Sequence, residues 1–277
     1  MSLRLADVGY TYGEGTSFAT RALDGVSLDI AVGELVLVLG ATGSGKSTLL
    51  RVAAGLLEPQ QGSATIEGAP LARDTARGNV GLVFQDAEAQ LFADTLVEDV
   101  AFGPKNMGRS AEEATAQALE SLLAVGLDPD VFAERSPFSL SGGEARRAAI
   151  AGVLAMQPRY LLADEPTAGL DAGGRAALRC LLLEARERAG VVVVSHTAEE
   201  FLGSADRAMV LAGGACTWYG PGDALVADPS VLEEAGLVAP PLLEVQMRAR
   251  LRGLDAGPFT LDASRAAERI AAAGGWG

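Results

Sequence analysis

The sequence predicts an α/β fold in which a parallel β-sheet carries a phosphate-binding loop. Three short apolar runs, at residues 34–39, 160–163 and 191–194, are predicted to be buried strands of this sheet. The first run leads into a glycine-rich turn at residues 40–47, and residues 48–54 are predicted to be a helix. This order is the context that a phosphate loop requires, because glycines let successive backbone N–H groups face the phosphates.

The glycine-rich turn offers the ligands of a nucleotide's phosphates. Lys46 is expected to reach the β- and γ-phosphates, and Ser47 to bind Mg²⁺. The residues expected to surround the phosphates are Gly40, Thr42, Gly43, Ser44, Gly45, Lys46, Ser47 and Thr48. A glycine-rich turn of some other α/β protein is the alternative, but the strand and helix on either side make a chance match rare.

The second apolar run ends in the paired carboxylates Asp164 and Glu165. If it is a strand parallel to the first, Asp164 lies at the carboxyl edge of the sheet beside the phosphates, where open α/β sheets bind ligands. Asp164 is then expected to hold Mg²⁺ through water, and Glu165 to act as general base on the attacking water. An acidic pair at a strand end is usually only solvated. The phosphate loop upstream favours the catalytic interpretation.

Ser195 and His196 directly follow the third run, and His196 is the only histidine in the chain. A lone histidine is more often a surface residue or a satisfied core residue than a catalyst. Its position directly after a core strand, at the edge predicted for Asp164, favours a contact with the γ-phosphate. A metal-ligand role is weakly supported, because there is no second histidine and Cys180 and Cys216 are far apart in sequence.

A second anion site is predicted where Ser141, Gly142 and Gly143 open an amphipathic helix that continues through residue 151. Such a helix start offers a serine hydroxyl and free N–H groups. For an isolated Ser-Gly-Gly, an ordinary helix-capping serine would be the better interpretation.

In this order, the motifs at residues 40–47, 140–144 and 161–166 resemble those of the nucleotide-binding subunit of ATP-binding cassette (ABC) transporters. The resemblance implies a P-loop NTPase (RecA-like) core with an antiparallel β subdomain, an inserted helical signature subdomain at about 86–156 and a small helical C-terminal extension. It also implies ATP and Mg²⁺ as cofactors, with the Ser141 turn binding the γ-phosphate held by an opposite subunit. Glu144 stands where glutamine is commonest in that family.

The resemblance assigns three further positions. Gln85 matches the glutamine that senses Mg²⁺ and the attacking water, and Tyr12 matches the aromatic residue that stacks on adenine. Asp171 matches the loop through which the active sites of two subunits communicate. On the residues alone, Gln85 is an ordinary strand-end amide and Tyr12 a sheet-surface aromatic.

The segment between the two anion sites narrows the resemblance to the ATPases of energy-coupling factor (ECF) transporters, which import vitamins and transition-metal ions in prokaryotes. In that segment the resemblance rests on residues 90–92, 97–106 and 136–140, and residues 149–156 and 232–237 resemble the same group. The chain looks more like the second ATPase of the shared vitamin module than a dedicated cobalt-uptake ATPase. The resemblance implies three partners: a second ABC ATPase, identical or related, a transmembrane coupling protein and a substrate-binding membrane protein. It places the protein peripherally at the cytoplasmic face of a prokaryotic membrane.

Composition restricts the alternatives. The net charge of −14 argues against nucleic-acid binding, and no apolar stretch approaches membrane-spanning length, so no direct membrane insertion is expected. Two unpatterned cysteines suit a reducing compartment.

A soluble ABC ATPase of DNA repair or translation is the alternative function, but the interval between the two anion sites is too short for a coiled-coil insertion. Glu165 and His196 argue against a scaffold without turnover.

The chain divides into a cassette at residues 1–225 and a helical extension at residues 226–277. In the extension, a stripe at helical spacing is either a core face or a candidate dimer contact; it comprises Leu243, Met247, Leu251 and Leu254. An acidic run after Gln85 is predicted to dock the coupling protein, with a solvated acidic face as the alternative. Its members are Asp86, Glu88, Asp94, Glu98 and Asp99.

Overall fold

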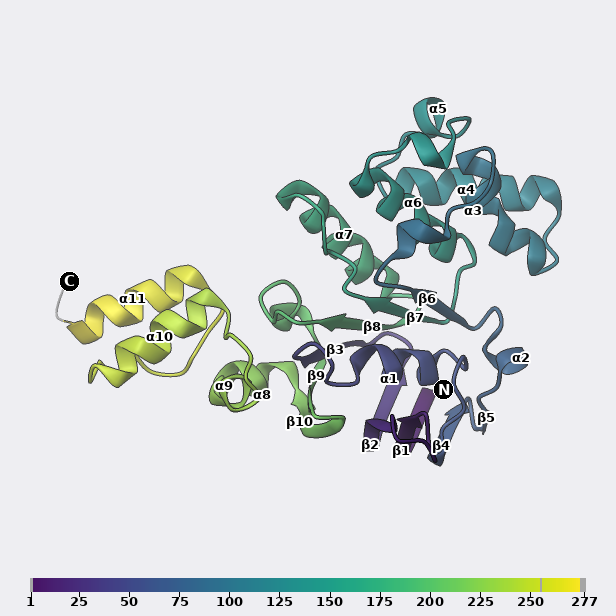
Figure 1. Cartoon of the computed structure of the whole chain (residues 1–277). Coiled ribbons are helices and arrows are strands. Elements are labelled where there is room, and N and C mark those ends of the chain that lie inside the picture. Colours follow the sequence, from purple (N-terminus) through teal and green to yellow (C-terminus); the bar gives the residue numbers. More distant parts are fainter. Residues whose placement is uncertain (1, 255, 275–277) are drawn as a thin grey trace.

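A six-stranded sheet forms the centre of the computed structural model, which describes residues 2–254 and 256–274 (Figure 1). Its strand order is β10-β9-β3-β8-β7-β6, in which β10 alone runs antiparallel to its neighbour. The strands are β3 (Leu35–Gly40), β6 (Val80–Val83), β7 (Tyr160–Asp164), β8 (Gly190–Ser195), β9 (Arg207–Ala212) and β10 (Ala215–Pro221). The three apolar runs of the sequence are therefore the adjacent strands β3, β8 and β7, as predicted.

Both faces of this sheet are covered, which explains why its central strands are apolar without alternation. All six residues of β3 are buried. Leu35 and Leu37 contribute to one hydrophobic core, whereas Val36 and Val38 face the other. The first core lies under the helical parts of the molecule, and the second joins the sheet to α1 (Lys46–Ala53) and to the other sheet.

The second sheet is antiparallel, with the strand order β2-β1-β4-β5. Its strands are β1 (Ser2–Tyr12), β2 (Thr20–Ala31), β4 (Gln61–Ile66) and β5 (Ala69–Pro70). The alternation of apolar and polar positions around Leu3, Leu5 and Val8 and around Val26, Leu28 and Ile30 predicts short strands here. The structure has longer ones, since β1 has 11 residues and β2 has 12. Irregularities in the register, one of them at Asp7 (φ 50°), interrupt the alternation while the strands stay paired.

A helical subdomain, at the upper right of Figure 1, shares the first hydrophobic core with the central sheet. It contains α3 (Leu96–Asn106), α4 (Ala111–Ala124), α5 (Pro129–Phe132) and α6 (Gly142–Ala155), with 3₁₀ turns at Ala87–Gln90 and Pro137–Ser139. A serine followed three residues later by glutamate, as at residues 110–113, predicts a capping box before a helix. It is present in α4: the Ser110 N–H donates to Glu113 at 2.9 Å, and the Glu113 N–H donates to Ser110 at 3.2 Å. Such a cap contributes about 1 kcal/mol.

Helices also complete the C-terminal part. α7 (Ala172–Ala185) packs beside the sheet, and a short α2 (Arg73–Ala76) and a 3₁₀ turn (Leu202–Ser204) lie in connections. The extension contains α8 (Gly222–Ala227), α9 (Ser230–Glu234), α10 (Pro241–Leu251) and α11 (Ala263–Gly274), and α10 and α11 project from the cassette in Figure 1. Within the described residues, no helix combines the length and the apolar character needed to cross a membrane.

The structure bears on two hypotheses about the extension: it shifts the end of the cassette, and it agrees with a core face as one of the two interpretations of the stripe. The boundary between residues 225 and 226 falls inside α8, whose Leu225 is fully buried in the main core, so the cassette continues through α8. The stripe on α10 mainly faces inward: Leu243 is fully buried and Met247 packs against the same core, whereas Leu251 is 87% exposed. Its helical spacing reflects packing within the chain.

Candidate functional site

The parallel strands bring the predicted site residues to one edge of the central sheet. Leu39 of β3 pairs with Ser195 of β8, and Asp164 of β7 pairs with Val194 of β8. The phosphate loop, the carboxylate pair and His196 all follow these positions directly. Their side chains therefore meet although the phosphate loop lies more than a hundred residues before the other two in sequence.

The phosphate loop requires glycine at specific points. Gly45 has φ 103°, and a Cβ atom there would lie 2.4 Å from the carbonyl oxygen of Ala22. At Gly40 a Cβ would lie 2.3 Å from Ser44 Oγ. Ser44 Oγ is itself buried and has no hydrogen-bond partner within the part of the chain that the structure describes. A phosphate oxygen in the loop would satisfy this hydroxyl.

Lys46 lies folded into the same loop. Its Nζ donates to the carbonyl oxygens of Gly40 at 2.7 Å and Ala41 at 2.9 Å. Burial lowers the pKa of Lys46, while the nearby carboxylates of Glu165 and Asp164 oppose this shift. Phosphate oxygens offer the buried ammonium stronger acceptors than these two carbonyls.

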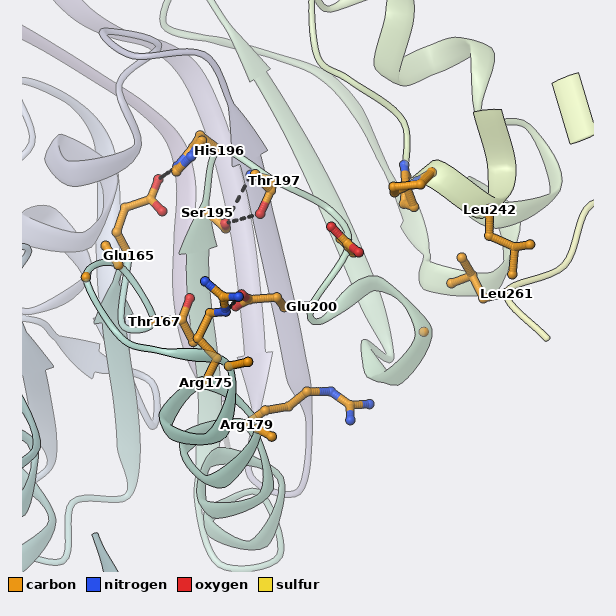
Figure 2. Close-up of a pocket in the computed structure, with 18 of the residues that line it drawn as sticks. Glu165, Thr167, Arg175, Arg179, Ser195, His196, Thr197, Glu200, Leu242 and Leu261 are labelled. Carbon is orange, nitrogen blue, oxygen red and sulfur yellow. Dashed lines mark hydrogen bonds and ion pairs between the residues drawn. The ribbon is translucent and has the colours of Figure 1, made fainter. Parts of the chain in front are cut away.

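Glu165 and His196 face one another at the edge of the sheet (Figure 2). Glu165 Oε1 lies 2.9 Å from His196 Nδ1, and the Glu165 side chain is only 13% exposed whereas that of His196 is 62% exposed. The pairing holds the Glu165 carboxylate in a fixed direction. In this arrangement, His196 contacts the predicted general base, and its predicted contact with a γ-phosphate would need the exposed part of its ring.

The predicted Mg²⁺ ligands are oxygen-bearing groups, the kind that this ion prefers. Asp164 ends β7 and is 7% exposed, and Ser47 lies in the first turn of α1. Gln85 is exposed after β6, and its backbone carbonyl accepts a hydrogen bond from Arg146. Hydroxyl, carboxylate and amide oxygens are thus available at the edge where the phosphate loop begins.

The first turn of α6 contains a capping box in which Ser141 and Glu144 are hydrogen-bonded to each other. The Ser141 N–H and hydroxyl both donate to Glu144 Oε2, at 2.7 Å and 2.8 Å. These hydrogen bonds lower the pKa of Glu144 below its usual value, the one from the backbone of Ser141 contributing most. The structure thus shows Ser141 as a helix cap, and its hydroxyl must leave Glu144 before it can donate to a phosphate.

The resemblance implies that the Ser141 turn binds the γ-phosphate held by an opposite subunit. On that expectation, replacing Glu144 by glutamine should strengthen ATP-dependent dimer formation by about threefold, because a negative charge beside the predicted γ-phosphate site is removed. Analytical ultracentrifugation of Glu144→Gln and wild-type protein at graded ATP concentrations measures this. Glu113→Gln removes the same charge from the capping box of α4 and is the matched control. Equal dimerisation of Glu144→Gln and wild type would show that Glu144 lies outside the field of the phosphate.

The two remaining predicted residues have clear contacts. The Tyr12 hydroxyl lies 3.4 Å from Thr48 Oγ1 and 3.3 Å from Arg51 Nη1, and its ring is in edge contact with Tyr10. Tyr12 therefore lies against α1, directly after the phosphate loop. Asp171 caps α7, since its Oδ1 accepts from the Gly174 N–H at 2.7 Å.

A cleft of about 1200 Å³ opens beside Glu165 and His196. One wall is formed by the loops after β7 and β8 and by α7, including Arg175, which lies 3.4 Å from Glu200. The opposite wall belongs to the C-terminal extension, with Leu242 and Leu261 (Figure 2). No local pattern in the sequence predicts this wall, because it depends on how the extension packs.

Arg146 is not among the site residues that the sequence predicted. It is 5% exposed and contacts backbone carbonyls of the loops after β6 and β7. One indication was available: Arg146 lies four residues before the buried Ile150, so it is a charged residue on the inner face of an amphipathic helix.

A phosphate loop at the head of a parallel sheet, with a carboxylate and a histidine beside it, defines the class of nucleotide-hydrolysing P-loop ATPases. The family model described as "ABC transporter" matches residues 23–168. The chain belongs to the ABC transporter family. It is an ATPase whose hydrolysis is coupled to transport.

Curated relatives support this assignment over nearly the whole chain. The energy-coupling factor transporter ATP-binding protein EcfA2 of Symbiobacterium thermophilum is 46% identical over 275 residues, covering 96% of this chain and 95% of that protein. EcfA2 of Clostridium acetobutylicum is 39% identical, covering 96% of each. Within the ABC family, the chain therefore belongs to the ATP-binding proteins of energy-coupling factor transporters. These relatives lend no support to the alternative role in DNA repair or translation.

Solved structures agree in fold. Each of the two described here has a TM-score of 0.72. A dimeric post-hydrolysis state of the ATP-binding cassette MJ0796 with ADP and Pi is 32% identical, covering 80% of this chain and 98% of that one. CbiO1 from Clostridium perfringens, part of the ABC transporter complex cbiONQ, is 30% identical, covering 88% and 98%. The predicted P-loop NTPase fold is thereby confirmed.

Proposed function

We propose that this chain works as one half of a nucleotide-sandwich dimer that powers an ECF-type importer. The observation that carries the proposal is that the two predicted anion-binding elements lie in different parts of one chain. The phosphate loop joins β3 to α1 in the central sheet, whereas the Ser141 turn begins α6 in the helical subdomain. A second subunit, identical or related, would place its Ser141 turn over the ATP held by the first. The dimeric state of the MJ0796 relative supports this arrangement.

In the proposed site, Lys46 and the loop N–H groups bind the β- and γ-phosphates. Ser47, Asp164 and Gln85 would hold Mg²⁺, which neutralises phosphate charge when bound. Glu165, oriented by His196, takes the proton of the attacking water. ATP binding closes the dimer and hydrolysis reopens it, so the site is complete only in the closed state.

The proposed cargo is a vitamin or a transition-metal ion. A transmembrane coupling protein and a substrate-binding membrane protein would complete the importer, with this chain bound peripherally to the cytoplasmic face of a prokaryotic membrane. The names of the ECF relatives and the cbiONQ component support this assembly. Substrate recognition would lie in the membrane protein.

The structure revises the docking surface proposed for the coupling protein. The Asp99 carboxylate accepts from the N–H groups of Phe92 and Ala93, at 2.7 and 2.8 Å, so it holds its own loop together. Glu88 lies 3.6 Å from Arg146. Asp86, Asp94 and Glu98 remain exposed.

An apolar anchor accompanies these three acids. Phe92 and Phe102 are 56% and 49% exposed and form an edge-to-face pair with centroids 4.8 Å apart. Aromatic pairs with a charged rim suit a partner helix that carries both apolar and cationic side chains. The docking surface is therefore defined as Asp86, Asp94, Glu98, Phe92 and Phe102.

Charge reversal on this surface is expected to abolish capture of the membrane partner. The double variant Asp94→Lys/Glu98→Lys should bind ATP as the wild type does, because neither residue contacts the phosphate loop. Co-purification with membrane proteins and ATP-driven uptake in cells are the measurements, and both should be lost.

The control is Glu120→Lys/Glu184→Lys, which changes the net charge equally at exposed positions on α4 and α7. It should retain partner capture and uptake. Undiminished capture and uptake by the Asp94/Glu98 variant would remove this surface from the mechanism while leaving the ATPase assignment intact.

A further inference from the structure

Arg146 joins three segments of the molecule through one buried guanidinium. It lies near the start of α6 and is 5% exposed. Its Nε donates to the carbonyl oxygen of Pro166 at 2.9 Å, its Nη1 to that of Gln85 at 2.8 Å, and its Nη2 to that of Glu165. Nη1 also lies 3.6 Å from the Glu88 carboxylate. The contacts connect the helical subdomain with the loops after β6 and β7.

Arginine is well suited to this position. Its guanidinium is planar, remains charged and carries five N–H donors in a fixed geometry. Three donors pointing in different directions can therefore fix three carbonyl oxygens at once. A lysine ammonium is a compact point charge and cannot reproduce that fork.

The backbone of Glu165 needs such support. Its φ of 48° lies in the left-handed region, which non-glycine residues rarely adopt unless the surroundings hold them there. The Glu165 N–H donates to Val194 on β8 at 3.0 Å, and Arg146 holds the Glu165 carbonyl on the other side. The direction of a side chain follows from its backbone. Arg146 thus helps to aim the Glu165 carboxylate at His196 and the phosphates.

We propose that Arg146 is a positioning residue for Glu165 and links it to the segment 85–90, which contains Asp86 of the docking surface. The same guanidinium holds the carbonyl of Gln85 and pairs with Glu88, so a partner that displaces residues 85–90 also shifts the support of Glu165. Docking would in this way change the turnover rate in addition to binding the partner. The inference rests on the proposed role of Glu165 as general base.

Arg146→Met in the full-length chain tests the proposal, because methionine fills part of the space without any donor. We expect kcat to fall about ten- to a hundredfold, since small misplacements of a reacting group have effects of this size. The KM for ATP should change by less than about threefold, because the phosphate loop is untouched. Lys105→Met, an exposed cation at the end of α3 in the same subdomain, is the matched control and should keep the wild-type kcat.

A double variant distinguishes positioning from general stability. In single-turnover experiments, Arg146→Met/Glu165→Gln should react as slowly as Glu165→Gln alone, because Arg146 acts through Glu165. If Arg146 had only a structural role, the rate loss of the double variant would equal the product of the losses of the two single variants. Arg146→Lys keeps the charge beside Glu88 and should recover only a small part of kcat. Thermal melting with and without ATP checks folding, and Arg146→Lys provides the same readouts if Arg146→Met does not fold.

Three results would overturn the proposal: a wild-type kcat in Arg146→Met, a raised KM with kcat unchanged, or losses that multiply in the double variant. If Glu165→Gln itself keeps normal turnover, the role of the general base fails instead. A slow Glu165→Gln with a normal Arg146→Met contradicts only the positioning role.

Discussion

Glu165→Gln is expected to lower ATP turnover by about a hundredfold or more, because glutamine keeps the shape of the side chain but removes the proton acceptor. ATP binding should persist, since the phosphate loop and Lys46 are unchanged. An ATP-bound dimer should then accumulate. Steady-state hydrolysis measures the first effect and size-exclusion chromatography with ATP measures the second.

The matched control is Glu187→Gln, an exposed carboxylate that follows α7. It should hydrolyse ATP at the wild-type rate. Near-normal turnover by Glu165→Gln would mean that another group activates the water. The close pairing of Glu165 with His196 would then serve structure alone.

Lys46→Ala and Ser141→Arg are expected to disable different halves of the composite site. Lys46→Ala should weaken nucleotide binding about ten- to a hundredfold, because a buried, charge-assisted set of hydrogen bonds to the phosphates is lost. Ser141→Arg should leave ATP binding by the monomer intact and block closure, because it places a bulky side chain at the start of α6.

Mixing the two variants tests whether the site forms between subunits. A mixed dimer contains one intact pair: the phosphate loop of the Ser141→Arg chain and the Ser141 turn of the Lys46→Ala chain. ATP-dependent dimerisation should therefore reappear in the mixture, although each variant alone stays monomeric. Each variant's circular dichroism spectrum should match the wild type. Two folded variants that never dimerise when mixed would contradict the arrangement in trans.

Much of the fold was predictable because its determinants are local. The valine run at residues 191–194 marked a strand buried on both faces, and the capping box at Ser110 marked the first turn of α4. The strand lengths of the antiparallel sheet were wrong, because bulges such as that at Asp7 break the alternation without breaking the pairing. The period of the stripe around Leu243 correctly predicted a helix with one apolar face. A period does not say whether that face packs in the core of the same chain or against a second subunit, and the packing of Leu243 decided for the core.

The sequence by itself determined the phosphate loop, the carboxylate pair at the end of β7 and the family, because each depends on residues adjacent in the chain. The tertiary structure decided which partner each polar group takes. It paired His196 with Glu165 and buried Arg146 against the carbonyls of Gln85 and Glu165. Such contacts depend on segments far apart in sequence, and their geometry exists only once the sheet and the helical subdomain have packed together.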